Sequence, residues 1–468
     1  MNIKNLFICL LLLFAAFFCP PAYSQDMSAK PPDENFTPED DKKNPFIAFS
    51  ETLFSNIFLM VLTGYIFDYP WARPTPESIN ENFTGTWLWE PTDGFKVNNF
   101  GHPYQGSFYF NAGRSNGFNF YESFFFSLLG SASWESLGER QQKSINDLIT
   151  TTIGGASIGE MLHRLYITAK NRGVPEPAAF LISPMDGLTR LITRREPEKE
   201  TGGLYALSFS AGAVLTDTNY VEKENNQDLF SFRGPAASLA INAVYGDPFE
   251  QQSVIPYEHF EFNAGLDADI GNYMNVYFIS DSYLLSFSPI NTVNDMLSAG
   301  LSLHYDFVSL GAFDMLNSTI DLLSNALDFT IKYQHVFNNE FILQLKMHGG
   351  GTFFGVSDYY SPKDSEETRK NYGGGINEKI YISIQKKRFG KLSLDVLRYV
   401  MWTYPKTVKF SSGKVCWDFV ELTYSYDISK NISLGISTSF AHEQGSFEGF
   451  PDTEKKSKVH KIFIAWSI

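Results

Sequence analysis

The sequence predicts an α+β protein in which an N-terminal helical domain precedes a transmembrane antiparallel β-barrel of about twelve strands. Three observations indicate this fold class. The chain begins with the pattern of a secretory signal, its first half carries apolar helical stretches, and from about residue 203 apolar and polar residues alternate. The expected domains are a signal peptide at 1–24, a flexible linker at 25–44, a helical domain at 45–195 and a barrel at 203–468.

The N-terminal signal consists of a lysine, an apolar run from Leu6 to Phe18 and small residues just before Gln25. This order is typical of secretory signals, so the mature chain is expected to begin near Gln25. A lipoprotein anchored at Cys19 is the alternative, but the bulky Phe18 does not suit lipobox cleavage. Since Cys9 also lies in the signal, Cys416 remains alone, and neither an internal disulfide nor a cysteine metal site is expected.

Composition narrows the class of protein. The linker at 25–44 is polar, charged and contains proline, so it lacks the apolar surface that folding requires. A formal net charge of −15 argues against a nucleic-acid partner. A mean hydropathy of −0.17 with 16% aromatic residues fits strands that have one apolar face, and it does not fit a bundle of membrane-spanning helices.

The second half of the chain has the period of two that is typical of strands. Residues 431–440, for example, set Ile432, Leu434, Ile436 and Phe440 against small polar residues. Twelve segments share this pattern: 204–216, 229–245, 257–269, 273–287, 297–309, 325–337, 340–355, 372–386, 390–403, 416–428, 430–442 and 457–468. Most are long enough to cross a bilayer as tilted strands, which takes about 9–11 residues. A soluble sandwich would use shorter strands of about 5–6 residues.

The connections and the last strand support an outer-membrane barrel. The segments 358–371 and 442–458 are long and polar, as extracellular loops are, whereas 427–431 is a tight turn. The closing strand "KIFIAWSI" places Ile462, Ile464, Trp466 and Ile468 on one face, which resembles the assembly signal of outer-membrane proteins. We therefore expect a Gram-negative outer membrane as the location, with outer-membrane lipid and the insertion machinery as partners.

An apolar stretch at 46–67 precedes the other helices. It is long enough to span a membrane, but a second spanning helix would hold the chain in the inner membrane and strand the later barrel. The sequence therefore predicts a buried helix, with Glu51 and Asn56 facing other polar groups.

Two further helices repeat one another. One runs from Glu122 to Glu135 and the other from Asp147 to Glu160, and each has a glycine at the eighth position after the first acid. Small residues surround both glycines, which would let the two helices approach closely. A duplicated helical hairpin is the simplest interpretation.

The stretch "HPYQGSFYFNAGRSNG" at 102–117, followed by "YESF", "SINDLITTTIGGASIGEMLHRL" and "SPMDGLTRLI" at 183–192, resembles the bacterial domain of unknown function 3943. The resemblance covers about residues 80–195. It implies an envelope protein that bears a secretory signal, and it implies no activity and no catalytic residues.

Seven polar residues of the helical domain form the candidate site, as a network that joins the helices to a polar lumen: His102, Arg114, Glu122, Glu135, Asp147, Glu160 and His163. In this hypothesis Arg114 pairs with Glu122 or Glu135, because buried charges persist only when paired. The Glu160/His163 spacing occurs in carboxylate-bridged metal bundles, but those need a second such pair, so we expect no metal and no cofactor. The alternative is that Glu160 and His163 bind backbone groups or Arg164.

Three functions remain open from the sequence. The first is an outer-membrane barrel of unknown specific activity, with the helical domain as a plug or cap and a role in transport or gating. The second is a lipid- or lipopolysaccharide-modifying enzyme that uses His102 with Ser107 or Ser115, although the sequence lacks a Gly-x-Ser-x-Gly nucleophile motif. The third is a surface scaffold or adhesin. The sequence favours a role without catalysis.

Overall fold

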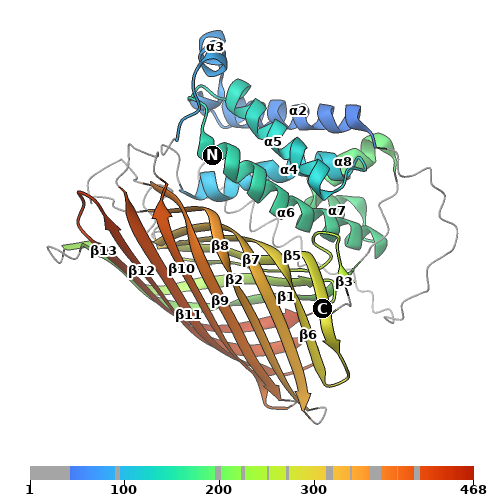
Figure 1. The fold of residues 1–468 in the computed structure, drawn as a ribbon, viewed down its shortest axis with the longest axis vertical. Coiled ribbons are helices and arrows are strands. Elements are labelled where there is room, and N and C mark those ends of the chain that lie inside the picture. The colour runs from blue at the N-terminus through green and yellow to red at the C-terminus, as the bar shows by residue number, and fades with distance from the viewer. Residues whose placement is uncertain are drawn as a thin grey trace. The chain divides into compact units, whose positions relative to one another are not determined.

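The computed structural model describes residues 43–89, 95–195, 202–222, 227–249, 252–269, 273–311, 320–337, 340–358, 370–386, 388–404 and 412–467. The expected signal peptide and nearly all of the linker lie outside these residues. The chain forms two compact units, one of residues 1–88 and 103–200 and one of residues 89–102 and 201–468. The first, the helical unit, and the second, the barrel unit, are coloured from blue to red along the chain in Figure 1.

The barrel unit is a closed antiparallel barrel (Figure 1). Neighbouring strands pair in the order β5-β4-β2-β1-β13-β12-β11-β10-β9-β8-β7-β6, and β6 pairs with β5 to close the ring, while the two-residue strand β3 adds to β5. The strands are β1 Leu204–Glu222, β2 Gln227–Tyr245, β3 Gln252–Ser253, β4 Phe260–Ala268, β5 Met274–Asn291, β6 Asp295–Leu310, β7 Ile320–Phe337, β8 Phe341–Asp358, β9 Lys370–Lys386, β10 Gly390–Thr403, β11 Gly413–Asp427, β12 Ile432–Phe447 and β13 Thr453–Ser467. The predicted fold class is confirmed.

Each predicted strand overlaps an observed one, but many observed strands extend further. The prediction of a long loop at 442–458 is wrong, because β12 and β13 continue to Phe447 and from Thr453. Residues 442–447 keep the two-residue alternation with polar side chains, which hides a strand from a search for apolar residues. Most of the predicted loop at 358–371 and the terminal Ile468 lie outside the described residues.

The outer wall of the barrel is apolar along much of its surface. On β12, Leu434, Ile436 and Phe440 are 46%, 55% and 43% exposed, whereas Ser437 on the opposite parity is 7% exposed. A face of large apolar side chains on a closed barrel suits contact with lipid hydrocarbon. Arg398 lies on this outward parity and pairs with Asp418 of β11 at 3.6 Å.

The helical unit consists of α2 Pro45–Met60, the π-helix η1 Val61–Ile66, the 3-10 helix η2 Pro70–Ala72, α3 Pro76–Thr84, α4 His102–Arg114, α5 Phe120–Leu137, α6 Ile145–Asn171, α7 Glu176–Ile182 and α8 Pro184–Thr193. The Asn119 side chain accepts from the backbone N–H of Glu122 at 3.0 Å, and the Glu122 carboxylate accepts from the backbone N–H of Asn119 at 3.0 Å. This reciprocal capping box fixes the start of α5.

The small residues of the repeated helices face a third helix. A side chain at Gly155 of α6 would meet the backbone of Gly106 of α4 at 2.5 Å, and one at Gly130 of α5 would strike the Tyr109 ring. The Ser127 hydroxyl lies 3.2 Å from the Gly106 carbonyl and 3.3 Å from the Thr151 carbonyl. Glycine therefore permits close packing of α5 and α6 on α4, which the repeat alone did not indicate.

The apolar helix at 46–67 differs from the prediction. Among the described residues, one helix, Pro45–Ile66, is long and apolar enough to cross a membrane, yet only 22% of its most apolar window is buried. Its buried residues are polar or small: Ala48, Glu51, Thr52, Ser55 and Gly64. The orientation predicted for Glu51 and Asn56 is right, but the prediction of a buried helix is wrong, because the apolar side faces outward.

A short segment of the N-terminal half packs on the outer wall of the barrel. We call residues 95–101 the strap; they include the π-helix η3 Val97–Gly101. The rings of Phe95 and Phe100 each lie 5.5 Å from the Phe307 ring of β6, and the Tyr305 hydroxyl donates to the Asn99 carbonyl. Tyr305 and Phe307 have the outward parity of β6, because the alternate residues His304 and Asp306 bind Lys379 in the lumen.

Candidate functional site in the barrel lumen

A buried lysine organises one group of charges in the lumen. The Lys332 ammonium lies 2.6 Å from His259 Nε2, 2.6 Å from a Glu261 oxygen and 2.7 Å from an Asp281 oxygen. Lys332 is 1% exposed, and its ammonium also lies 5.2 Å from the centre of the Tyr283 ring. Because a buried charge is costly unless paired and hydrogen-bonded, the two carboxylates account for its position.

The same three partners have the donor atoms of a metal site. Ligand atoms of His259, Glu261 and Asp281 lie within 4.8 Å of one another, which is the only such group among the residues that the structure describes. The Lys332 ammonium contacts all three, so it already supplies the positive charge that a cation would bring. The arrangement therefore does not call for a metal.

A second lysine joins strands that are not neighbours in the sheet. The Lys379 ammonium of β9 binds Asp306 of β6 and lies 2.9 Å from His304 Nδ1. The Tyr399 hydroxyl of β10 donates to Asp306 at 2.9 Å. Since β9 and β10 do not pair with β6 in the sheet, these bonds cross the interior and brace the barrel.

One serine and histidine lie at the distance of a nucleophile and base. The Ser302 hydroxyl is 2.8 Å from His304 Nε2, but both residues are 0% exposed. The other ring nitrogen faces the Lys379 ammonium, where a catalytic triad would place a carboxylate. This pair has no access to substrate and lacks the orienting acid, so it does not support the enzyme alternative.

A cluster of apolar side chains lies in the lumen beside these charges. We call this cluster the septum: Val308, Leu310, Ile320, Leu322, Leu397, Tyr399, Met401, Trp417 and Ala441. They come from β6 and β7 on one side and from β10, β11 and β12 on the other. Contacts between strands that are not neighbours in the sheet can form only across the interior, so the septum lies in the lumen.

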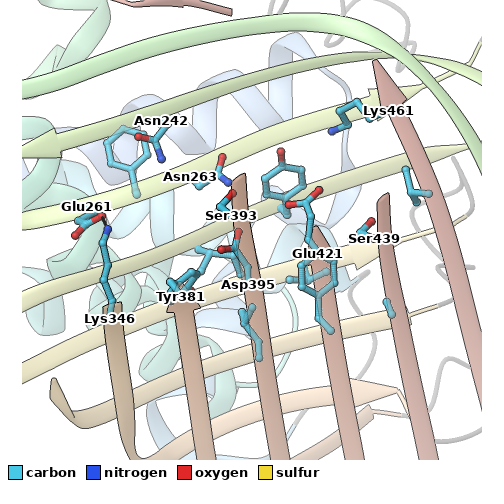
Figure 2. A pocket seen from close by; sticks show the side chains of 18 of the residues that line it. Asn242, Glu261, Asn263, Lys346, Tyr381, Ser393, Asp395, Glu421, Ser439 and Lys461 are labelled. Carbon is cyan, nitrogen blue, oxygen red and sulfur yellow. Dashed lines mark hydrogen bonds and ion pairs between the residues drawn. The ribbon is translucent and has the colours of Figure 1, made fainter. Parts of the chain in front are cut away.

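A polar cavity of about 300 Å³ lies against the septum. Figure 2 shows Lys346 beside Glu261 at one side of it, with Asp395 and Glu421 on neighbouring strands. Lys461, which also lines the cavity, pairs with Asp267 at 3.1 Å. Tyr277, Tyr381, Trp417 and Phe419 contribute aromatic surface. The cavity thus offers both signs of charge, hydroxyl groups and aromatic rings to a small molecule, at the lower end of the usual size of ligand pockets.

The site residues predicted from the sequence lie in the helical unit or at its border, and they form several separate groups. Arg114 and Arg164 both bind Glu160, with N···O distances of 2.7 and 2.8 Å. The prediction that Arg114 pairs with Glu122 or Glu135 therefore named the wrong acid, whereas the Glu160–Arg164 contact was foreseen as an alternative. Burial alone would raise the pKa of Glu160, but the two guanidinium groups lower it to about 2.

The other predicted residues have different partners. His163 Nδ1 lies 2.6 Å from Asp186, whose second oxygen accepts from the Ser183 hydroxyl. Glu122 binds Lys43 at 2.7 Å near the surface, and Glu135 accepts the backbone N–H of Ser144 at 2.7 Å. Asp147 accepts from the Asn146 amide at 3.0 Å in the first turn of α6, and the buried His102 begins α4. These acids cap helices and loops, and the contacts do not bring them to one cavity.

Comparison with known proteins identifies part of the chain. Residues 86–185 match the Domain of unknown function (DUF3943). The match confirms the resemblance predicted for about residues 80–195, and it includes the strap. No curated protein matches the chain.

Solved structures similar to the chain include outer-membrane channels, transporters and the outer membrane protease OmpT from Escherichia coli. The COG4313 outer membrane channel from Pseudomonas putida F1 is 10% identical with a TM-score of 0.30, over 57% of this chain and 96% of that one. The P. putida toluene transporter TodX is 9% identical with a TM-score of 0.24, over 56% and 90%. The Ralstonia pickettii toluene transporter TbuX is 10% identical with a TM-score of 0.23, over 56% and 89%.

None of the charged residues in the lumen is among the candidates predicted from the sequence. Lys332 stands on the polar parity of its segment, which already indicates a lysine that points inward. Its partners lie 51 to 73 positions earlier in the chain, on or beside β4 and β5, and only the closed barrel brings them to β7. The candidate acids and the two candidate histidines, His102 and His163, lie close together in the sequence of the DUF3943 region, and this clustering favoured them over the lumen residues.

One buried acid outside the DUF3943 match predicts a pH dependence. Burial raises the pKa of Glu51 to about 7, although hydrogen bonds from Thr189 and Asn116 lower it. A carboxyl whose pKa is higher in the folded state binds its proton more tightly there, so folding stability falls as the pH rises from about 4.5 to 7. The cost at pH 8 is on the order of 3 kcal/mol.

We expect Glu51→Gln to stabilise the helical unit at pH 8 and to change little at pH 5. The measurement is urea unfolding of the full chain in detergent, followed by the helical circular-dichroism signal at both pH values. Equal midpoints for the variant and the original protein at pH 8 would contradict the prediction.

Proposed function

We propose that the protein transports small polar solutes across the outer membrane through its barrel, and that the septum gates the passage. One arrangement carries the proposal: a cavity with charged groups in the interior of the barrel borders a cluster of apolar side chains that come from strands which are not neighbours in the sheet. Apolar constrictions close a pore by excluding water, and they open when the side chains move apart. The cavity would hold the solute on one side of this gate.

The outer membrane is the location that best fits the barrel. Closed barrels with apolar outer walls are typical of that membrane, and the expected signal at 1–24 would export the chain. Assembly by the insertion machinery belongs to the same proposal. The role of the helical domain at 45–195 as a plug or cap stays a prediction.

The septum can be tested by conductance of the full protein in planar bilayers. The original protein is expected to carry little or no current. Trp417→Ala removes the largest side chain of the septum, and we expect this variant to form channels of clearly measurable, severalfold higher conductance. Trp402→Ala is the matched control, because Trp402 lies on the neighbouring strand with its side chain 46% exposed on the outer wall.

Conductance that is unchanged by Trp417→Ala, or that rises equally in Trp402→Ala, would contradict gating by the septum. Heat-modifiable migration of both variants on gels shows whether their barrels are folded. If folded variants carry no current and admit no small solute into vesicles, the transport proposal is wrong.

A further inference from the structure

On one face of the helical unit, large apolar side chains are exposed and polar side chains are buried, which is the reverse of a soluble protein. Eight large residues of α2 and η1 are between 42% and 80% exposed, and we call them the apolar face: Phe46, Phe49, Phe54, Ile57, Phe58, Val61, Tyr65 and Ile66. Water-soluble helices bury such residues and expose the polar ones. Exposed apolar patches of this size mark a surface that another apolar phase covers.

The polar edge of the same helix is held inside the unit. Glu51 accepts from Asn116 at 2.8 Å and from Thr189 at 2.9 Å, and the Asn56 amide donates to Ser133 at 2.7 Å. These bonds fix the rotation of α2 about its axis. They also mean that α2 cannot leave its neighbours to span a bilayer alone without breaking them.

The apolar face carries no charge. Glu51 is the single charged residue from Pro45 to Ile66, and it points inward. A protein partner would usually meet polar groups at the rim of its interface, and the chain just before α2, residues 26–44, is too polar to cover this face itself. Hydrocarbon is the occupant that matches eight uncharged apolar side chains.

The end of the helix has the residues that favour a membrane surface. The rings of Tyr69 and Trp71 stack at 5.9 Å, and the Arg73 guanidinium lies 5.5 Å from the centre of the Tyr65 ring. Tyrosine and tryptophan concentrate at the boundary between hydrocarbon and headgroups, where arginine reaches phosphate. Tyr121 and Phe125 of α5, which packs on α2, are 65% and 60% exposed and extend the apolar surface.

Covalent links tether the helical unit to the barrel unit at more than one point. Leu88 is bonded to Trp89, and Pro103 to His102, at the two ends of the barrel-unit segment that contains the strap. The chain from the end of α8 at Thr193 to the start of β1 at Leu204 can span at most about 40 Å. The helical unit is therefore tethered to a barrel whose apolar outer wall suits contact with lipid.

We propose that α2 and η1 lie in the plane of the membrane surface, with the apolar face inserted among lipid acyl chains and the polar edge bound to α4, α5 and α8. The helical unit is then a peripheral membrane domain in its own right. This inference does not depend on the transport proposal, because it concerns a different surface.

The test uses the full protein in vesicles of phosphatidylethanolamine and phosphatidylglycerol whose acyl chains carry bromine. A fluorescent label is placed at Phe58→Cys in a Cys416→Ser background, and at Glu81→Cys, an exposed position of α3, as the control. We expect the label at position 58 to be quenched by bromine and shielded from aqueous iodide. The label at position 81 should show the opposite pattern.

A second labelled variant guards against a folding defect at Phe58. With the label at Ile57→Cys, the added changes Phe54→Lys and Val61→Lys should abolish bromine quenching while the helical circular-dichroism signal stays. If the labels at 57 and 58 are quenched by iodide and not by bromine, the proposal is overturned. Protection that appears only after envelope proteins are added would also overturn it, in favour of a protein partner.

Discussion

Replacing Lys332 with Met is expected to destabilise the barrel more than any other single change in the lumen. The variant leaves Asp281 in the interior without the ammonium that lies 2.7 Å from it, and it leaves Glu261 with only the Lys346 ammonium. Removing one partner of a buried ion pair typically costs about 3–5 kcal/mol, because the remaining charge stays desolvated. The temperature at which the barrel loses its fast, folded migration on gels should therefore fall markedly.

Lys430→Met is the control, because Lys430 is exposed in the turn between β11 and β12. It should leave that temperature unchanged. Adding Glu261→Gln and Asp281→Asn to Lys332→Met should restore part of the loss, since the effects of residues in one network are not additive. A barrel that melts at the original temperature without Lys332 would show that its charge network is not a source of stability.

Glu160→Gln is expected to have the largest effect in the helical unit. Glu160 is 0% exposed between Arg114 and Arg164, so the variant leaves two guanidinium groups without their shared carboxylate. A loss of about 3–5 kcal/mol follows from the same reasoning. It should appear as a lower urea midpoint of the helical circular-dichroism signal at pH 7.

The pH dependence of this effect has a defined sign. The pKa of Glu160 is lowered to about 2, so the carboxylate contributes its stability above pH 4.5 and loses it as the pH falls toward 2. The difference between Glu160→Gln and the original protein should therefore shrink in acid. Glu122→Gln, at a carboxylate that is 38% exposed, should lower the urea midpoint far less, because exposed ion pairs contribute little. Equal effects of the two variants would count against the buried network.

The barrel could be predicted from the sequence because the pattern of each strand lies within a short segment of the chain. Alternation along residues such as 431–440 indicates which side of a strand faces lipid. The length of a strand indicates whether it can cross a bilayer. The ends of β12 and β13 were missed because polar side chains replace apolar ones beyond the hydrocarbon, while the backbone pairing continues. A strand end in which no residue is strongly apolar is harder to recognise, because its two faces differ little in polarity.

The candidate site was less predictable because it depends on register and on helix rotation. Lys332 meets Glu261 only after β4, β5, β6 and β7 have paired in their observed registers. Arg114 meets Glu160 because glycines bring α4 and α6 together, and no spacing within one helix could indicate this. The hydropathy of α2 does not distinguish a helix buried in a protein from a helix whose apolar side faces lipid, because both are equally apolar.

The strap sets an order for the assembly of the molecule. The Asn99 carbonyl accepts the Tyr305 hydroxyl across 206 positions of sequence, which is a very non-local contact. Contacts between distant residues form slowly, because the long intervening loop must close first. The strap therefore cannot pack on the barrel until β6 has taken its place in the wall. Until then the rings of Phe95 and Phe100 lack the Phe307 ring on which they pack, so this part of the DUF3943 match is among the last to become ordered.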